Sequence, residues 1–135
     1  MGTFGNYLED ELLDHFLGKG SYTPPTIYIG LSTADPTEDG SGMAEPSTGS
    51  YARVTTSGSD WAVSSGGESS NANALSFPES TAAWSGGSSL THFALFDAAS
   101  DGNMLAHGAL TTSRAVDAAG ITLQFTVGEL VITLD

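Results

Sequence analysis

One stretch constrains the fold more than any other part of this sequence, because large apolar residues occupy both of its faces. Between Leu90 and Asp97, apolar side chains stand at odd and even positions alike. This pattern predicts a central β-strand that is covered on both sides. A second apolar run, Met104–Leu110, follows an Asp-Gly pair at 101–102. Two such runs joined by Asp-Gly predict a β-hairpin, so the chain is expected to be built on a sheet.

Shorter runs with strand character surround this hairpin. They are separated by loops rich in Gly and Ser, and 17 of the 135 residues are Gly. We predict strands at Thr26–Ser32, which reads as half-buried, and at Tyr51–Thr55, Ala74–Phe77, Ile121–Thr126 and Leu130–Leu134, the last two forming a pair bent at Gly128. With the hairpin, they predict a mainly β protein: an antiparallel sandwich or small barrel of about seven strands, with long Gly/Ser-rich loops.

One helical pattern stands near the N-terminus, between Asn6 and Leu17. Leu8, Leu12 and Phe16 recur every four residues and form one apolar stripe, and Asn6 is the predicted N-cap. The length fits a single domain, 1–135, with an N-terminal helical segment at 1–20 and a β domain at 21–135. The stripe either covers one end of the β core or docks onto a neighbouring subunit. Leu8, Leu12 and Phe16 are therefore candidate interface residues.

The charge balance excludes one class of partner. Sixteen acidic residues face three basic ones, which gives a net charge of −13. Three scattered cations cannot form the basic stripe that nucleic acid requires, so no nucleic acid is expected. The same charge makes identical subunits repel one another, and an oligomer should therefore prefer moderate salt. The apolar runs are too short for membrane insertion.

The sequence lacks a strong catalytic constellation. It contains no G-x-S-x-G elbow, and nothing singles out one hydroxyl among many. Two acidic residues lie near tryptophans in the sequence, Asp60 near Trp61 and Glu79 near Trp84. They leave glycoside cleavage by a pair of carboxylates as an open alternative. We predict that the protein is not an enzyme and has no catalytic residues and no cofactor.

A partial calcium-loop pattern spans residues 35–46. Asp35, Thr37 and Asp39 supply oxygen atoms at the expected spacing, and Gly40 fills the sixth place. Pro46, however, stands where a bidentate Glu is required. Turn formation is the favoured interpretation, although a bound cation stays an alternative.

A histidine pair is the second pattern with possible metal chemistry. His92 and His107 fall at roughly opposite positions of the predicted hairpin. No carboxylate stands at a fixed offset on the same face, so a structural cross-strand pair is favoured over a two-histidine metal site. No metal site is predicted.

The two tryptophans lie in the Gly/Ser-rich connections. Trp61 and Trp84 would stack on sugar rings if both were exposed together. More often such residues anchor loops to a core or fill protein interfaces. Both are candidate interface residues here, and a glycan or receptor on the host surface stays an alternative partner.

Resemblance to a known family is carried by five stretches of the chain. These are NYLEDELLDHFLG, YTPPTIYIGLSTADPTEDGSGMAEPS, YARV, LSFPESTAAWS and THFALFDAASDGNMLAHGALTTS. They resemble a family of small virion proteins of tailed bacteriophages, commonly labelled tail fibre proteins, over nearly the full chain.

The resemblance implies a non-enzymatic structural protein of the virion. Such a protein is assembled in the host cytoplasm and works by contacts with other virion proteins on the tail or tail-fibre apparatus. A homo-oligomer is expected. Two alternatives remain open: a decoration (cement) protein on the capsid surface, and a receptor- or glycan-binding module.

Overall fold

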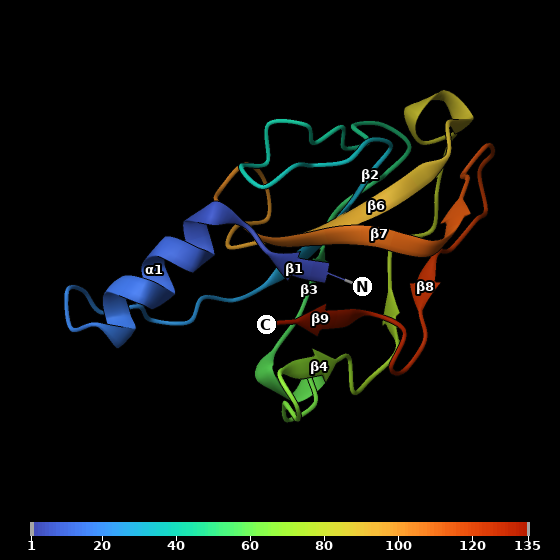
Figure 1. Ribbon diagram of the computed structural model, residues 1–135. Coiled ribbons are helices and arrows are strands. Elements are labelled where there is room, and N and C mark those ends of the chain that lie inside the picture. The colour runs from blue at the N-terminus through green and yellow to red at the C-terminus, as the bar shows by residue number, and fades with distance from the viewer. Residues whose placement is uncertain (1, 135) are drawn as a thin grey trace.

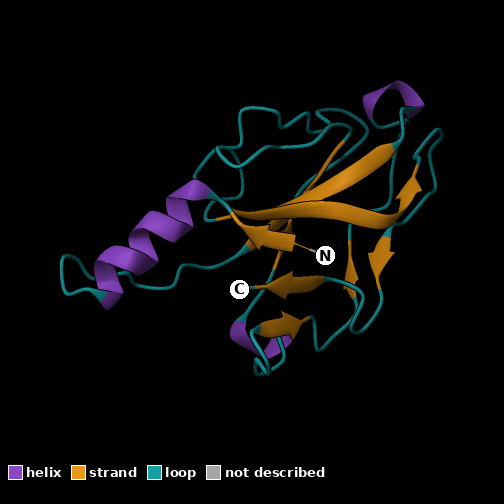
Figure 2. Ribbon diagram, viewed as in Figure 1, coloured by secondary structure: helices purple, strands orange, loops and turns teal. Residues whose placement is uncertain are grey.

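The computed structural model describes residues 2–134, in which seven strands form one sheet that curls into a half-barrel (Figures 1 and 2). The order across this sheet is β3-β2-β6-β7-β1-β9-β4, and β5-β8 form a separate two-stranded sheet. The strands are β1 (Gly2–Phe4), β2 (Tyr28–Ser32), β3 (Val54–Thr55), β4 (Glu68–Ser70), β5 (Leu75–Ser76), β6 (Leu90–Phe96), β7 (Met104–Arg114), β8 (Gln124–Phe125) and β9 (Val131–Thr133). The mainly β prediction is confirmed, and pairing is antiparallel except between β1 and β9.

The predicted hairpin is confirmed as β6 and β7. Its turn places Asp101 and Gly102 at φ of 53° and 75°, in the left-handed region. A Cβ on Gly102 would lie 2.6 Å from Oδ1 of Asp97, so this turn requires glycine. Both faces of β6 are buried, as its two apolar rows predict.

Strand β2 was predicted to be half-buried, and that prediction is wrong. Ile29 and Leu31 point into the core, but Gly30 and Ser32 on the opposite face are buried as well. The connection 33–53 covers this second face. A Cβ on Gly30 would stand 2.7 Å from Oε2 of Glu45, so glycine lets the loop approach closely.

The predicted pairing of the last two strands is also wrong. Strand β8 pairs with β5, whereas β9 pairs with β4 and β1. The cause is Asn71, whose side chain is buried between them: its Oδ1 accepts a hydrogen bond from the Leu130 amide at 2.9 Å, and its Nδ2 donates to the Thr126 carbonyl at 2.8 Å. These bonds hold the bend at 126–130 against Asn71, so the two strands diverge to different partners.

Strand β1 lies in the segment that was predicted to be helical. It pairs antiparallel with β7, where Thr3 faces His107, and parallel with β9, where Gly2 faces Ile132. Three residues are too few to show an alternating pattern, so only the fold reveals this strand. It ties the N-terminal segment into the centre of the sheet.

Within residues 2–134 there is one α-helix, α1 (Asn6–Phe16), together with 3₁₀ turns at Gly58–Asp60 and Ser85–Gly87. Asn6 is the first helical residue and not the N-cap; Gly5 takes that position, with φ of −86° and ψ of 165°. The Gly5 amide donates to the Leu105 carbonyl and the Asn6 amide to the Glu38 carbonyl, both at 2.9 Å. Backbone groups of neighbouring segments therefore satisfy the helix start. None of the helices in this part of the chain has the length and apolar character to cross a membrane.

A partly buried ion pair, with 5% of the Arg53 side chain and 22% of the Glu45 side chain exposed, fastens the 33–53 connection to the β6–β7 hairpin. Arg53 donates from Nε and Nη2 to the two carboxylate oxygens of Glu45, each at 2.9 Å. Its Nη1 also donates to the carbonyls of Ala98 and Asp101 beside the hairpin turn, at 2.8 and 2.9 Å. Tyr51 donates its hydroxyl to Glu45 at 2.6 Å. Burial, and then the negative charge of Glu45, raise the pKa of Tyr51 far above its usual range.

Candidate assembly surface

Helix α1 and the extended segment that returns from it, residues 18–27, project from the half-barrel (Figure 1). We call this projection the arm. The predicted stripe of α1 is covered only in part: Leu8 is 9% exposed and Leu12 packs partly against the core, but Phe16 is 83% exposed. Leu13 and Leu17 are exposed beside Phe16. The half of α1 next to the sheet thus covers the core, and the far half, the arm tip, presents apolar side chains to solvent.

Hydrogen bonds hold the return segment against the helix. The amides of Lys19 and Gly20 donate to the Asp14 carbonyl at 2.7 and 3.0 Å. The amide of Tyr22 donates to Nδ1 of His15 at 3.2 Å. Tyr22 and Ile27 then pack partly against the core. The arm is therefore a structured extension and presents the tip in a fixed place.

An apolar groove lies where the arm meets the sheet. It has a volume of about 270 Å³. All but one of the residues that line it carry an apolar or aromatic side chain, and they come from α1, the return segment and the sheet: Phe4, Leu8, Leu12, Tyr22, Pro24, Pro25, Ile27, Trp61, Leu95, Leu105, Ala106 and Ile132, with Ser69 as the exception. The groove therefore brings together three of the five predicted interface residues, namely Leu8, Leu12 and Trp61.

Trp61 presents its ring to this groove with its polar atom already satisfied. The indole Nε1 donates to the Thr56 hydroxyl at 3.1 Å. The Thr56 hydroxyl donates in turn to the Ile27 carbonyl at 2.9 Å. Because the one polar group of the indole is bonded inside the chain, the exposed part of the ring is an apolar wall.

Acidic side chains lie near the groove wall formed by Tyr22. Burial raises the pKa of Tyr22, and the charges of Tyr7, Asp97 and Glu11, in that order, raise it further. Loss of hydration raises the pKa of Tyr7, and the charges of Glu11 and Asp97 raise it further. Glu11 precedes Leu12 of the groove and Asp97 comes two residues after Leu95, so negative charge lies beside the groove at this end.

Trp84 lies elsewhere, with 0% of its surface exposed. Its Nε1 donates to the Gly49 carbonyl at 2.9 Å, and its ring meets Tyr51 edge-on with centroids 5.1 Å apart. The indole thus fills the core and offers no surface to a partner. The glycan-binding alternative requires Trp61 and Trp84 to be exposed together, and burial of Trp84 removes that platform.

Asp60 has a structural role in its loop. Its carboxylate accepts hydrogen bonds from Nδ2 of Asn73 at 3.0 Å and from the Ser57 amide at 2.8 Å. These bonds, with that from Asn73 the largest cause, lower the pKa of Asp60. A general acid for glycoside cleavage needs a raised pKa, so the environment of Asp60 favours the opposite behaviour.

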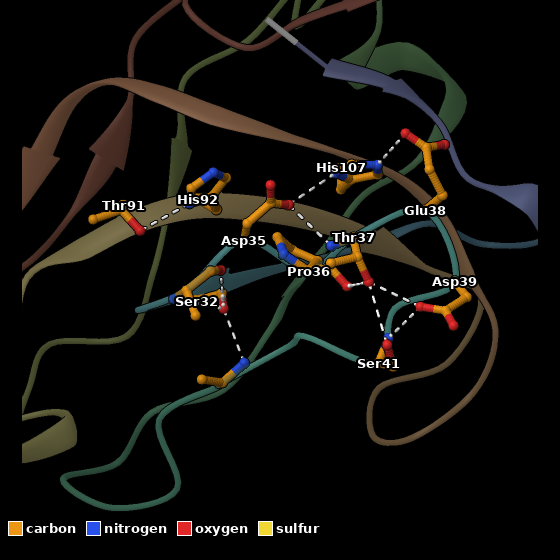
Figure 3. A network of polar contacts seen from close by, with 12 residues as sticks. Ser32, Asp35, Pro36, Thr37, Glu38, Asp39, Ser41, Thr91, His92 and His107 are labelled. Carbon is orange, nitrogen blue, oxygen red and sulfur yellow. Dashed lines mark hydrogen bonds and ion pairs between the residues drawn. The ribbon is translucent and has the colours of Figure 1, made fainter.

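The partial calcium-loop pattern forms a self-bonded turn (Figure 3). Oδ1 of Asp35 accepts the Thr37 amide at 2.9 Å, and Oδ1 of Asp39 accepts the Thr37 hydroxyl at 2.8 Å and the Ser41 amide at 3.0 Å. One carboxylate oxygen of each aspartate and the Thr37 hydroxyl are therefore engaged in bonds within the loop, which favours the turn interpretation. Among residues 2–134, no cluster of three or more His, Asp or Glu side chains is placed to hold a metal ion.

These bonds predict an acid-shifted titration of Asp39. Hydrogen bonds from Ser41, first, and from Thr37 lower its pKa to about 2. Because the folded value is depressed, the stabilisation is complete above the unfolded pKa of about 3.9 and is lost as the pH falls through about 2. We expect the side-chain carboxyl resonance of Asp39 to show a midpoint near 2 by NMR, and Ser41→Ala to raise that midpoint. A midpoint near 3.9 in the unmutated chain would contradict this prediction.

The two histidines are not directly opposite in the hairpin. His107 pairs with Ala94 and His92 with Ala109, which places the rings two positions apart on one face. His107 instead lies beside the 35–41 loop, with Nε2 at 3.3 Å from Oε1 of Glu38, while His92 is bonded to Thr91 (Figure 3). Two carboxylates of this distant loop lie near His107, Glu38 and, at 3.8 Å from Nδ1, Asp35, so no fixed sequence offset revealed them.

The fold and this surface together define a class: a small β protein whose projecting arm and apolar groove are suited to contact with other proteins. The chain belongs to the family described as Podophage GP4 fiber I protein gp80, which matches residues 3–133. This membership confirms the resemblance to tail fibre proteins and makes the chain a structural protein of the bacteriophage virion that contacts other virion proteins. Comparison with curated proteins found no match.

Proposed function

We propose that this chain is a non-enzymatic subunit of the tail-fibre apparatus that assembles as a homo-oligomer in the host cytoplasm and joins the virion through its arm and groove. The observation that carries the proposal is the half-covered stripe of α1. The stripe begins buried at Leu8 and ends at Phe16, 83% exposed. Exposure of an apolar tip to water is unfavourable, and the free energy falls when another protein covers that tip.

Location in the particle is the direct test of the tail-fibre assignment. Heads and tails are separated from purified virions, and each fraction is analysed by mass spectrometry. We expect the chain in the tail fraction. Finding it only on heads would overturn the assignment and support the capsid-decoration alternative.

Phe16→Ser is expected to weaken self-association by about 10- to 100-fold. Burying a Phe side chain contributes roughly 1.5–3 kcal/mol, and about 1.4 kcal/mol corresponds to a factor of ten. Phe16 is exposed in the single subunit, so the substitution leaves the core intact. The association constant is measured by sedimentation equilibrium over a wide range of protein concentration.

Val127→Ser is the matched control, because Val127 is also an exposed apolar residue but lies in the turn between β8 and β9, away from the arm (Figure 1). We expect it to change association less than twofold. Equal effects of the two variants would contradict a specific role for the arm tip.

Salt dependence separates association between copies from binding to a basic partner. Each copy carries a net charge of −13, and added salt shortens the screening length from about 30 Å at 0.01 M to about 8 Å at 0.15 M. Self-association should therefore strengthen over this range. Weakening with salt would contradict assembly between copies of this acidic chain.

A further inference from the structure

We propose that the groove of one subunit receives the arm tip of a second copy, with the ring of Phe16 seated against Trp61 and Lys19 facing Glu11 and Asp97. The inference rests on the proposed function and identifies the partner of the same surface. It is argued from three properties of the chain: the size of the groove, the position of the tip, and the charges on each.

The groove is large enough for an aromatic ring. Its volume is about 270 Å³, whereas an apolar cavity of about 150 Å³ in another protein admits benzene. Leu12 and Trp61 supply walls on which such a ring packs. Space therefore remains for an aliphatic neighbour of the ring, as Leu17 is of Phe16.

The tip cannot use the groove of its own chain. Leu8 and Leu12 line the groove, and Phe16 continues the same stripe one turn further out, beyond the sheet. The helix between Leu12 and Phe16 is continuous, so the ring of Phe16 cannot turn back to the wall formed by Leu12. A second molecule is needed to bring tip and groove together.

One charge on the tip is opposite in sign to two charges beside the groove. The chain has three Lys or Arg residues, and two of them are paired internally, Arg53 with Glu45 and Arg114 with Glu129. Lys19, the third, lies exposed at the arm tip, three residues after Phe16. Glu11 and Asp97 do not line the groove but lie beside it in the chain, one residue before Leu12 and two residues after Leu95. Both carboxylates are close enough to Tyr22 to raise its pKa. Lys19, with the exposed Asp14 beside it on the tip, would therefore meet these carboxylates and offset part of the repulsion between whole chains.

Tip and groove are different surfaces, so their contact is heterologous. Each copy would offer a tip to one neighbour and a groove to the next. Repetition of such a contact gives a closed ring when the rotation closes, and a filament when it does not. One inserted Phe16 side chain buries little surface area, so a single contact between two copies is weak. In a closed oligomer, several such contacts together would hold the copies more tightly.

Cysteine pairing tests the contact directly, because the chain contains no Cys of its own. A tagged Leu17→Cys variant, which keeps Phe16, is mixed with an untagged Ser69→Cys variant under mild oxidation. A disulfide between the two forms only when the tip of one copy meets the groove of another. Pro24→Cys, on an exposed part of the groove wall, is a second groove variant. It is needed because Ser69→Cys removes the hydrogen bond from the Ser69 hydroxyl to the Ala62 carbonyl.

We expect the mixed disulfide to be the main cross-linked product with either groove variant, Ser69→Cys or Pro24→Cys. Adding Phe16→Ser to the Leu17→Cys variant should lower the yield of this disulfide at least tenfold. Val127→Cys in place of Leu17→Cys is the control and should give no more than a tenth of that product. An oligomer that forms normally without the mixed disulfide at either groove position would overturn this inference and leave the proposed function intact. So would a tail particle in which both groove variants cross-link to a different protein. A chain that is monomeric in all salt and missing from tails would instead overturn the proposed function.

Discussion

Replacement of Arg53 by Met is expected to lower the free energy of unfolding by about 3–5 kcal/mol. Only 5% of the Arg53 side chain is exposed, and its guanidinium binds both oxygens of Glu45 while it stacks 3.6 Å above the Phe96 ring. Removing one member of a fully buried ion pair costs roughly 3–5 kcal/mol, because the other charge is left uncompensated. The Glu45 side chain is 22% exposed, so we expect the loss at the lower end of this range. The carbonyls of Ala98 and Asp101 also lose their donor. Urea denaturation followed by tryptophan fluorescence measures the change.

Arg114→Met is the matched control. Arg114 also pairs with a glutamate, Glu129, at 3.0 Å, but 40% of its side chain is exposed. Exposed pairs contribute about 0–1 kcal/mol, so the control should remain close to the unmutated chain. Adding Glu45→Gln to Arg53→Met should restore part of the loss, because it removes the unpaired charge. Similar midpoints for Arg53→Met and Arg114→Met would show that the Glu45 pair does not fasten the loop.

The long, two-sided elements of this fold could be predicted from the sequence, because their patterns are local. Two apolar rows in the sequence predict that both faces of β6 are buried, and the Asp-Gly pair at 101–102 predicts the turn to β7. Strand β1 could not be found, because three residues carry no period and its partners lie more than 100 positions away. The partners of β8 and β9 were missed because Asn71, an ordinary polar residue in a Ser-rich loop, determines them through its burial.

The candidate surface was predictable in its residues but not in its extent. The spacing of Leu8, Leu12 and Phe16 fixes which face of α1 is apolar. Where the cover ends depends on the distance from the helix to the sheet, which is a property of the assembled chain. The two tryptophans show the same limit, since each follows a small or acidic residue in a polar loop and only the fold sends one to the groove and the other to the core.

Replacement of Trp84 by Ala is expected to destabilise the chain by about 3–5 kcal/mol, as is typical when a large buried aromatic residue is truncated. Its ring touches Tyr51 edge-on and approaches Phe77, with centroids 6.3 Å apart, so the cavity would open beside two aromatic side chains. The Gly49 carbonyl would lose the hydrogen bond from Nε1. Thermal unfolding followed by circular dichroism provides the measurement, with urea denaturation as a second probe of the same transition.

Trp61→Ala provides the contrast, because Trp61 lines the groove and is only partly buried. Its loss should cost less than about 2 kcal/mol of stability. It should nevertheless weaken self-association, since the groove loses a wall. The two tryptophans therefore separate folding from assembly: Trp84→Ala acts on the fold, and Trp61→Ala acts mainly on contact between copies. A Trp84→Ala chain as stable as the unmutated one would contradict the placement of this indole in the core, and a Trp61→Ala chain with unchanged association would contradict the role of the groove.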